Sequence, residues 1–180
     1  MSEQTQVAVF GGGCFWCTEA VFAGLKGVIS VMPGYTGGHV KNPSYQAVCS
    51  GITGHAEVSK IEFDPNKITY TDLLTVFFAT HDPTTLNRQG ADVGTQYRSA
   101  IFFASEAQKQ EAEKFIAEID GKGQGNKIVT EVTPAGEFYA ADESHRQYYL
   151  RNTEQAYCQL VISPKLEKLQ VKYAELLKKK

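Results

Sequence analysis

The 180-residue sequence predicts an α+β fold, in which a mixed sheet and its helices form a single-domain two-layer α/β sandwich. Strand-like and helix-like patterns interleave along the chain without the strict alternation of a doubly wound parallel sheet. The length is ordinary for one domain, and neither an internal repeat nor a low-complexity linker divides the chain. We therefore expect one catalytic domain over residues 1–180, with a core at about 7–161 and a C-terminal helix at about 164–177.

The individual elements follow from apolar periodicity and from turn and capping residues. Short apolar runs or alternating patterns predict strands at residues 7–10, 28–32, 56–63, 97–104 and 127–134. Helical spacing predicts helices at residues 14–23, 70–80, 106–119, 144–152 and 164–177. Thr69 or Thr71 can cap the second of these helices and Ser105 the third, while Pro164 suits the first turn of the last. The glycine-rich residues 121–125 predict a loop.

Composition and charge exclude several classes of protein. Hydrophobic residues make up 42% of the chain, and 18 basic against 20 acidic residues give a net charge of −2, so no basic face for nucleic acid is expected. The first six residues are polar, and the apolar run that follows is too short for a signal peptide or a membrane span. We expect a cytoplasmic protein without membrane association. Four cysteines are too few for a disulfide scaffold, which leaves buried apolar residues or working thiols.

Residues 11–17, with the sequence GGGCFWC, carry the clearest chemical signal. Three glycines between a strand and a helix permit positive φ and close backbone approach, and they place Cys14 at or near the helix N-terminus. Free N–H groups and the helix dipole there favour a thiolate, the nucleophilic form of cysteine, so we expect a lowered pKa for Cys14. The alternative is an ordinary buried cysteine that follows a glycine turn.

Cys14 and Cys17 also form a C-x-x-C pair, which in a cytosolic chain can be a thioredoxin-like redox pair. The bulky Phe-Trp between the two cysteines and the lack of a recognisable cis-proline loop weaken that interpretation. A structural zinc site is disfavoured because Cys49 and Cys158 stand alone in the sequence. His55 lies near other polar candidates, and a lone histidine is more often structural than a metal ligand.

At these residues the sequence resembles the peptide methionine sulfoxide reductase A family, whose signature is similar to residues 12–17. Further segments match in the family's order: GYTGG at 34–38, NPSY at 42–45, CSGITGHAE at 49–57, HDPT at 81–84, NRQG at 87–90, DVGTQYRS at 92–99, and Phe138, Tyr139 and His145. The resemblance runs from about Val7 to about Val161. It implies a two-layer sandwich related to the ferredoxin-like arrangement, and an enzyme that reduces the S epimer of methionine sulfoxide, free or protein-bound.

The resemblance implies that Cys14 is the nucleophile and Glu57 the general acid. A thiolate that attacks the sulfoxide sulfur cannot expel oxide, so an acid must protonate the oxygen as the S–O bond breaks. A carboxyl group that does this near neutral pH needs a raised pKa, which burial in an apolar pocket would supply. Without the resemblance, Glu57 is more simply interpreted as a surface carboxylate on a strand.

The resemblance implies roles for five further residues. Tyr45 and Tyr97 resemble the family's pair of tyrosines that donate hydrogen bonds to the sulfoxide oxygen. Asp92 resembles the family's acid that organises the site through hydrogen bonds, and its alternative role is that of a turn aspartate. Phe15 and Trp16 resemble the walls of a pocket for the S-methyl group, since sulfur and methyl groups pack well on aromatic rings. Ordinary core packing is the alternative for either ring.

Attack would leave Cys14 as a sulfenic acid, which a second thiol must convert into a disulfide. Cys17, Cys49 and Cys158 are the candidates, and we expect Cys17 to face the core. Cys158 resembles the position where many family members hold a resolving cysteine. A helix-like segment follows Cys158 here in place of a glycine-rich tail, so Cys158 and a small external thiol both remain candidates.

The resemblance further implies partners and the absence of a cofactor. Thioredoxin or another dithiol would reduce the disulfide by exchange, with oxidised proteins and free methionine sulfoxide as substrates. No metal and no organic cofactor is expected, and we expect a monomer. The alternative function is a thiol-disulfide oxidoreductase that uses the C-x-x-C pair. A thiol peroxidase and a non-catalytic domain that binds methionine-containing segments are two further hypotheses.

Overall fold

A computed structural model describes residues 4–122 and 127–179 of the chain. Its strands are β1 (Gln6–Gly11), β2 (Val28–Thr36), β3 (Ala56–Phe63), β4 (Arg88–Gln89), β5 (Asp92–Val93), β6 (Ala100–Phe103), β7 (Glu131–Pro134) and β8 (Tyr139–Ala140). Its α-helices are α1 (Phe15–Ala23), α2 (Tyr45–Cys49), α3 (Tyr70–Thr80), α4 (Glu106–Lys122), α5 (Tyr148–Arg151) and α6 (Ser163–Lys172).

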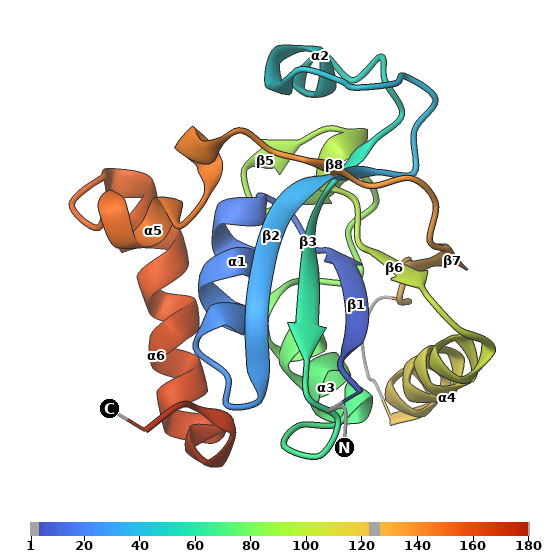
Figure 1. Ribbon diagram of the computed structural model, residues 1–180, viewed down its shortest axis with the longest axis vertical. Coiled ribbons are helices and arrows are strands. Elements are labelled where there is room, and N and C mark those ends of the chain that lie inside the picture. The colour runs from blue at the N-terminus through green and yellow to red at the C-terminus, as the bar shows by residue number, and fades with distance from the viewer. Residues whose placement is uncertain (1–3, 123–126, 180) are drawn as a thin grey trace.

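Six of the strands form one sheet in the order β7-β6-β1-β3-β2-β8 (Figure 1). The pairs along this sheet are antiparallel except β6 with β7, which is parallel. β4 and β5 form a separate two-stranded ribbon. A mixed sheet with helices packed on it confirms the predicted α+β fold.

One face of the sheet packs against the helices and forms the main core. Alternate residues of a strand point to the same face, so Phe10 of β1 and Ile61 and Phe63 of β3 all point toward the helices. Helices α1, α3, α4 and α6 contribute side chains to the same cluster. The ring of Phe10 stacks on Phe77 of α3 with centroids 4.7 Å apart. Each such buried aromatic ring contributes about 1.5–3 kcal/mol through burial, and this core holds the C-terminal half of α1 against the sheet through Val21 and Phe22.

A smaller core lies on the opposite face of the sheet, where Val9, Val58 and Phe102 are buried. Phe138, from the segment that leads into β8, packs on this face, and the Lys60 ammonium lies 5.3 Å from the centre of its ring. β8 adds to the sheet beside β2, with Tyr139 opposite Tyr35. The pairing of β8 with β2 brings the segment around Tyr139 next to the C-terminal end of β2.

Several predicted boundaries are wrong in the central part of the chain. Tyr97 lies in a 3₁₀ turn, Thr95–Tyr97, and not in the strand predicted at 97–104, which begins only at Ala100. The turn follows Gly94, whose φ of 146° is readily reached only by glycine. The strand predicted at 127–134 begins at Glu131. Most of the loop predicted at 121–125 lies outside the described residues, and α4 continues through Lys122.

Two predicted helices near the C-terminus are shorter than expected. The helix predicted at 144–152 is divided into a 3₁₀ turn, Glu143–His145, and the short α5, because Gln147 has a left-handed backbone. The helix predicted at 164–177 ends at Lys172, where Tyr173 leaves the helical conformation and packs against the main core.

Four short elements were not predicted, namely α2, β4, β5 and β8. Each has five residues or fewer, which is too short for a recognisable periodicity.

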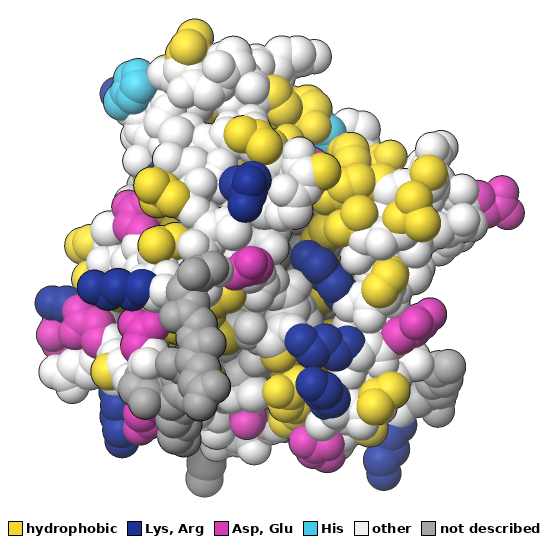
Figure 2. Space-filling view, turned by 180° about the vertical axis from the view of Figure 1, so that it is seen from behind, with side chains coloured by type: hydrophobic (Ala, Val, Ile, Leu, Met, Phe, Trp, Pro, Cys, Tyr) yellow, Lys and Arg dark blue, Asp and Glu magenta, His cyan; other side chains and the backbone are white. Residues whose placement is uncertain are grey.

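The surface differs between the two ends of the molecule. Seen from behind, hydrophobic side chains gather in the upper half, while most acidic and basic side chains lie in the lower half (Figure 2). The upper end is also where α2, β5 and β8 lie in the ribbon view (Figure 1). Within the described residues, no helix combines the length and the apolar character needed to cross a membrane.

Candidate active site

Cys14 lies in the turn between β1 and α1 and is the residue that precedes the first turn of the helix. Its backbone is extended, with φ −60° and ψ 130°, and its carbonyl accepts the N–H of Cys17 at 3.1 Å. The turn depends on Gly13, whose φ is 95° and where a Cβ would lie 2.7 Å from Cγ of Gln89. The predicted position of Cys14 at a helix N-terminus is confirmed.

The prediction that this position lowers the pKa of Cys14 is wrong. Cys14 is 8% exposed, and burial raises the pKa of its thiol well above the ordinary value. The neighbouring Glu57 and Cys17 raise this pKa further, since their charged forms repel a thiolate, while hydrogen bonds from the Trp16 backbone and the Tyr157 hydroxyl lower it. Desolvation outweighs the favourable N–H groups because the rest of the fold covers the helix end.

Glu57 lies on β3, on the same face of the sheet as Ile61 and Phe63, so its side chain points toward the N-terminus of α1. The carboxyl is 1% exposed, and its Oε1 accepts the backbone N–H of Phe15 at 3.3 Å. Its Oε2 has no hydrogen-bond partner. Burial raises the pKa of Glu57 to about 8, against the lowering effect of the Phe15 N–H and with a further raising effect from Asp92. At neutral pH this carboxyl group is therefore predominantly protonated and can donate from the free oxygen.

Tyr45 and Tyr97 are both half-buried and lie within reach of the charges of this site. Burial is the main cause of the raised pKa of each phenol. Glu57 raises both values further, and Cys14 also raises that of Tyr97. Both phenols therefore keep their protons at neutral pH and remain hydrogen-bond donors. Both rings pack against the cluster that contains Cys14, so the two phenols and the Glu57 carboxyl are protonated donors in the surroundings of this thiol.

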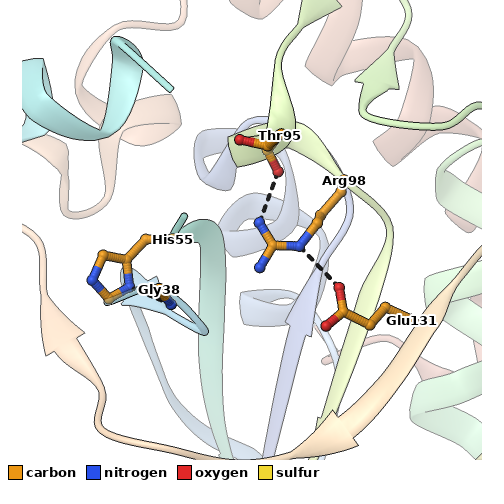
Figure 3. Close-up of polar contacts among 5 residues, drawn as sticks. All are labelled: Gly38, His55, Thr95, Arg98 and Glu131. Carbon is orange, nitrogen blue, oxygen red and sulfur yellow. Dashed lines mark hydrogen bonds and ion pairs between the residues drawn. The ribbon is translucent and has the colours of Figure 1, made fainter. Parts of the chain in front are cut away.

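The turn that carries Tyr97 is anchored by Arg98 (Figure 3). Its Nη1 donates to the carbonyl of Thr95 at 3.0 Å, and its Nε forms an ion pair with Glu131 of β7 at 3.0 Å. Arg98 thus ties the 3₁₀ turn to the edge of the sheet, which holds Tyr97 in place.

His55 has a structural role two residues before Glu57. Its Nδ1 accepts the N–H of the neighbouring Gly38 (Figure 3) at 3.0 Å. Its Nε2 lies 2.6 Å from the carbonyl oxygen of Val40. The ring thereby fastens the loop after β2 to the start of β3, in agreement with the structural interpretation of this histidine. Within the described residues, no group of three or more His, Cys, Asp or Glu side chains is placed to hold a metal ion.

Aromatic rings pack in the same cluster as Cys14, and His145 lies among them. Its ring centroid is 5.5 Å from that of Phe15, 4.4 Å from Tyr45 and 5.9 Å from Trp16. The indole N–H of Trp16 donates to Nδ1 of His145 at 3.2 Å, and the indole stacks on Tyr148 at 3.7 Å. Phe15 and Trp16, predicted as pocket walls, therefore lie together, and a methyl group that packs on both must lie next to His145.

Asp92 reaches the site through Tyr157, which was not predicted. The Tyr157 hydroxyl donates to Oδ2 of Asp92 at 2.8 Å and lies 3.5 Å from Sγ of Cys17. It also lowers the pKa of Cys14 through a hydrogen bond. Tyr157 and His145 were missed as site residues because they reach α1 by packing from far along the chain; only the match of His145 to the family's segments pointed to it.

The remaining cysteines lie at different depths. Cys17 is 2% exposed and faces the core, as predicted. Cys158 is completely buried at the start of a π-helix, Cys158–Ile162, in the same apolar cluster as Cys14. Cys49 at the end of α2 is exposed, and partial burial raises the pKa of its thiol while the neighbouring Tyr45 hydroxyl lowers it. All four thiols are free.

Comparison with known families gives one match over nearly the whole chain. The sequence model of a family described as "Peptide methionine sulfoxide reductase" matches residues 6–177. A relative from Deinococcus radiodurans, named peptide methionine sulfoxide reductase MsrA, is 55% identical over 172 residues, which are 95% of this chain and 84% of the relative. One of the same name from Saccharolobus solfataricus is 53% identical over 173 residues, covering 96% of this chain and 97% of the relative.

Two solved structures of yeast Mxr1 are also similar to this chain. The reduced form has a TM-score of 0.80 and 36% identity, over 88% of this chain and 91% of that one. Mxr1 in complex with Trx2 has a TM-score of 0.56 and 27% identity, over 82% of this chain and 87% of that one.

Proposed function

Because the chain belongs to the peptide methionine sulfoxide reductase family, it reduces methionine sulfoxide, and we propose that Cys14 and Glu57 perform this reaction on the S epimer, free or in proteins. The observation that carries the assignment is the buried carboxyl of Glu57, with a pKa of about 8 and one oxygen without a partner. A carboxylate with only a structural role is expected to have hydrogen-bond or ion-pair partners, or to be exposed to solvent. A general acid must instead be protonated and must have an oxygen that is free to donate its proton to the substrate.

The reaction transfers one oxygen atom from the methionine sulfur to Cys14. The Cys14 sulfur attacks the sulfoxide sulfur and forms an S–S bond, and Glu57 donates its proton to the sulfoxide oxygen. The S–O bond of the substrate then breaks as the hydroxyl group passes to the Cys14 sulfur, and the S–S bond breaks so that its electron pair leaves with methionine. The proton of the Cys14 thiol replaces the one that Glu57 gave up. Methionine leaves, and Cys14 is left as a sulfenic acid.

The other residues of the site bind and orient the sulfoxide. The hydroxyls of Tyr45 and Tyr97 donate to the sulfoxide oxygen, and the rings of Phe15 and Trp16 receive the S-methyl group. Asp92 acts through Tyr157, because its carboxylate accepts a hydrogen bond from the Tyr157 hydroxyl. This bond holds the hydroxyl beside the thiol of Cys17. No metal and no organic cofactor is needed for these steps.

Regeneration needs two electrons from a dithiol. A second cysteine condenses with the sulfenic acid, and thioredoxin or another dithiol reduces the resulting disulfide by exchange. The structure of Mxr1 with Trx2 supports thioredoxin as the reductant. Oxidised proteins and free methionine sulfoxide are the substrates, and residues 1–180 act as one catalytic domain in a cytoplasmic monomer.

Steady-state reduction of resolved sulfoxide epimers tests this assignment. With thioredoxin, its reductase and NADPH, we expect the wild type to turn over the S epimer and to leave the R epimer unchanged, and Cys14→Ser to form no methionine from either. Insulin reduction in the same assay tests the alternative function. Turnover of insulin without turnover of the S epimer would contradict the proposal and favour the thiol-disulfide oxidoreductase.

A further inference from the structure

We propose that Cys17, and not Cys158, is the thiol that resolves the sulfenic acid on Cys14. The inference rests on the proposed function, since it concerns the step that follows methionine release. The reaction requires a second sulfur that can reach Cys14 without rearrangement of the fold, and three thiols are available in addition to Cys14.

Cys14 and Cys17 share the first turn of α1. Cys14 immediately precedes the helix, and its carbonyl accepts the N–H of Cys17 at 3.1 Å, which closes the turn between them. Side chains three residues apart on a helix lie on the same side, with Cβ atoms about 5–6 Å apart, so a small shift brings them within disulfide range. Both side chains are buried in the same apolar cluster.

One hydroxyl group borders both sulfurs. The Tyr157 oxygen lies 3.5 Å from Sγ of Cys17, and the same hydroxyl lowers the pKa of the Cys14 thiol. Both sulfurs therefore lie in the surroundings of one hydroxyl group. The same hydroxyl is oriented by Asp92 at 2.8 Å, and it can donate to whichever sulfur is ionised during condensation and exchange.

Cys158 is held in a different way. It is completely buried, and it begins a π-helix that continues directly into α6. The N–H of Gln159 bonds to the carbonyl of Gln155, so the backbone on both sides of Cys158 is ordered. The Cys158 thiol acts on Cys17, whose pKa it raises. For Cys158 to reach Cys14 this helical segment would have to unwind, whereas Cys17 needs only a side-chain rotation.

The condensation balances without a further reactant. The Cys17 sulfur attacks the sulfur of the Cys14 sulfenic acid, the S–O bond breaks, and the hydroxyl leaves as water with the proton of the Cys17 thiol. The product is a Cys14–Cys17 disulfide. An external dithiol then reduces it to two thiols and is itself oxidised to a disulfide.

Single-turnover mapping of the thiols tests the proposal. Reduced protein is mixed with excess S-methionine sulfoxide without reductant, and methionine and thiols are counted before free thiols are alkylated and the peptides analysed by mass spectrometry. We expect one methionine formed and two thiols lost per chain in the wild type, with a Cys14–Cys17 disulfide. The double variant Cys49→Ala/Cys158→Ala, which retains only Cys14 and Cys17, should give the same disulfide.

The Cys17→Ala variant should still release one methionine but lose only one thiol, with a sulfenic acid on Cys14 that dimedone traps. Its turnover with thioredoxin should fall at least tenfold. A Cys14–Cys158 disulfide in the wild type would overturn the proposal, and this result does not depend on any variant that could fail to fold. Absence of methionine from the wild type would instead contradict the proposed function itself.

Discussion

The site is built from two regions of the molecule that differ in how firmly they are held. One is a floor, formed by the β1–α1 turn and the start of β3, which carries Cys14, Phe15 and Glu57. The other is a cover, residues 143–158, which brings His145 and Tyr157 over the floor from short helical turns. Phe15 and Glu57 are almost completely buried in the floor, whereas both residues of the cover are half-buried.

The difference between floor and cover indicates a division of tasks. The floor packs against the main core through α1 and β3, so it can hold a protonated carboxyl that is costly to bury. The cover supplies rings and one hydroxyl that adjust the surroundings of the thiols. Substitutions in the floor should therefore have large effects, and substitutions in the cover smaller ones.

The largest expected effect is on catalysis and comes from Glu57→Gln. Because the amide keeps the shape of the carboxyl but cannot donate a proton as an acid, we expect single-turnover methionine formation to slow by about 10²–10⁴-fold. Quench-flow measurement at pH 7 checks this. Glu62→Gln on the same strand, where the carboxylate lies near Ser30, is the matched control and should react at the wild-type rate. A Glu57→Gln variant as fast as this control would contradict the assignment.

The same substitution should also stabilise the protein. The pKa of Glu57 is about 8 in the folded protein against about 4.5 when unfolded, so folding disfavours the ionised form. The resulting cost is absent below pH 4.5, grows between pH 4.5 and 8 and is then constant. At pH 7 it amounts to at most about 3 kcal/mol, and we expect Glu57→Gln to gain roughly 1–3 kcal/mol.

Urea unfolding of the wild type and of Glu57→Gln at several pH values measures this gain. The stability difference between the two proteins should vanish near pH 4 and be largest above pH 8. Titrating groups common to both proteins, such as the half-buried His81, cancel in the difference. A difference that does not vary with pH would show that the folded-state pKa of Glu57 is not raised.

In the cover, Tyr157→Phe should reduce the reactivity of Cys14. The Tyr157 hydroxyl lowers the pKa of Cys14, so its loss should raise this pKa and slow alkylation at pH 8 by roughly three- to tenfold. Iodoacetamide labelling of Cys14, followed by mass spectrometry, gives the rate. Tyr149→Phe, whose hydroxyl pairs with Ser163, is the matched control. Equal labelling rates in the two variants would show that Tyr157 does not act on the thiol.

The smallest expected effect is spectroscopic and concerns His145. Trp16 is the chain's only tryptophan, and its indole N–H donates to His145. Burial lowers the pKa of His145, so protonation should break this bond and change the fluorescence only at pH values below 6.5. His145→Asn should abolish the transition, while His39→Asn, which alters an exposed histidine, should keep it. A transition unaffected by His145→Asn would place its origin elsewhere.

The sequence predicted the floor better than the cover, for physical reasons. Cys14 lies in the turn just before α1 and Glu57 lies in β3, and both belong to contiguous motifs, so local reasoning and the family resemblance both apply to them. His145 and Tyr157 reach the site through contacts with residues 129 and 140 positions away, which no local pattern encodes. The short α2, α5 and β8 are similarly held by tertiary packing and not by their own periodicity.

The pKa of Cys14 shows where local reasoning fails. A helix N-terminus favours a thiolate when it is solvated, and the sequence gives no measure of how deeply that end is buried. Here burial of the thiol, with a further contribution from the neighbouring Glu57, reverses the expected direction. The raised pKa of Glu57 was expected from the family resemblance and is confirmed, because strand alternation and the helix above it bury the side chain.

The pH dependence of single-turnover methionine formation tests the central claim most directly, namely that Glu57 donates the proton that allows Cys14 to reduce the sulfoxide. We expect the rate of the reduced wild type to fall as the pH rises through about 8, where Glu57 ionises. Glu57→Gln should be slow and show no such fall. A wild-type rate that continues to rise above pH 8, together with a Glu57→Gln variant that reacts as fast, would contradict the account.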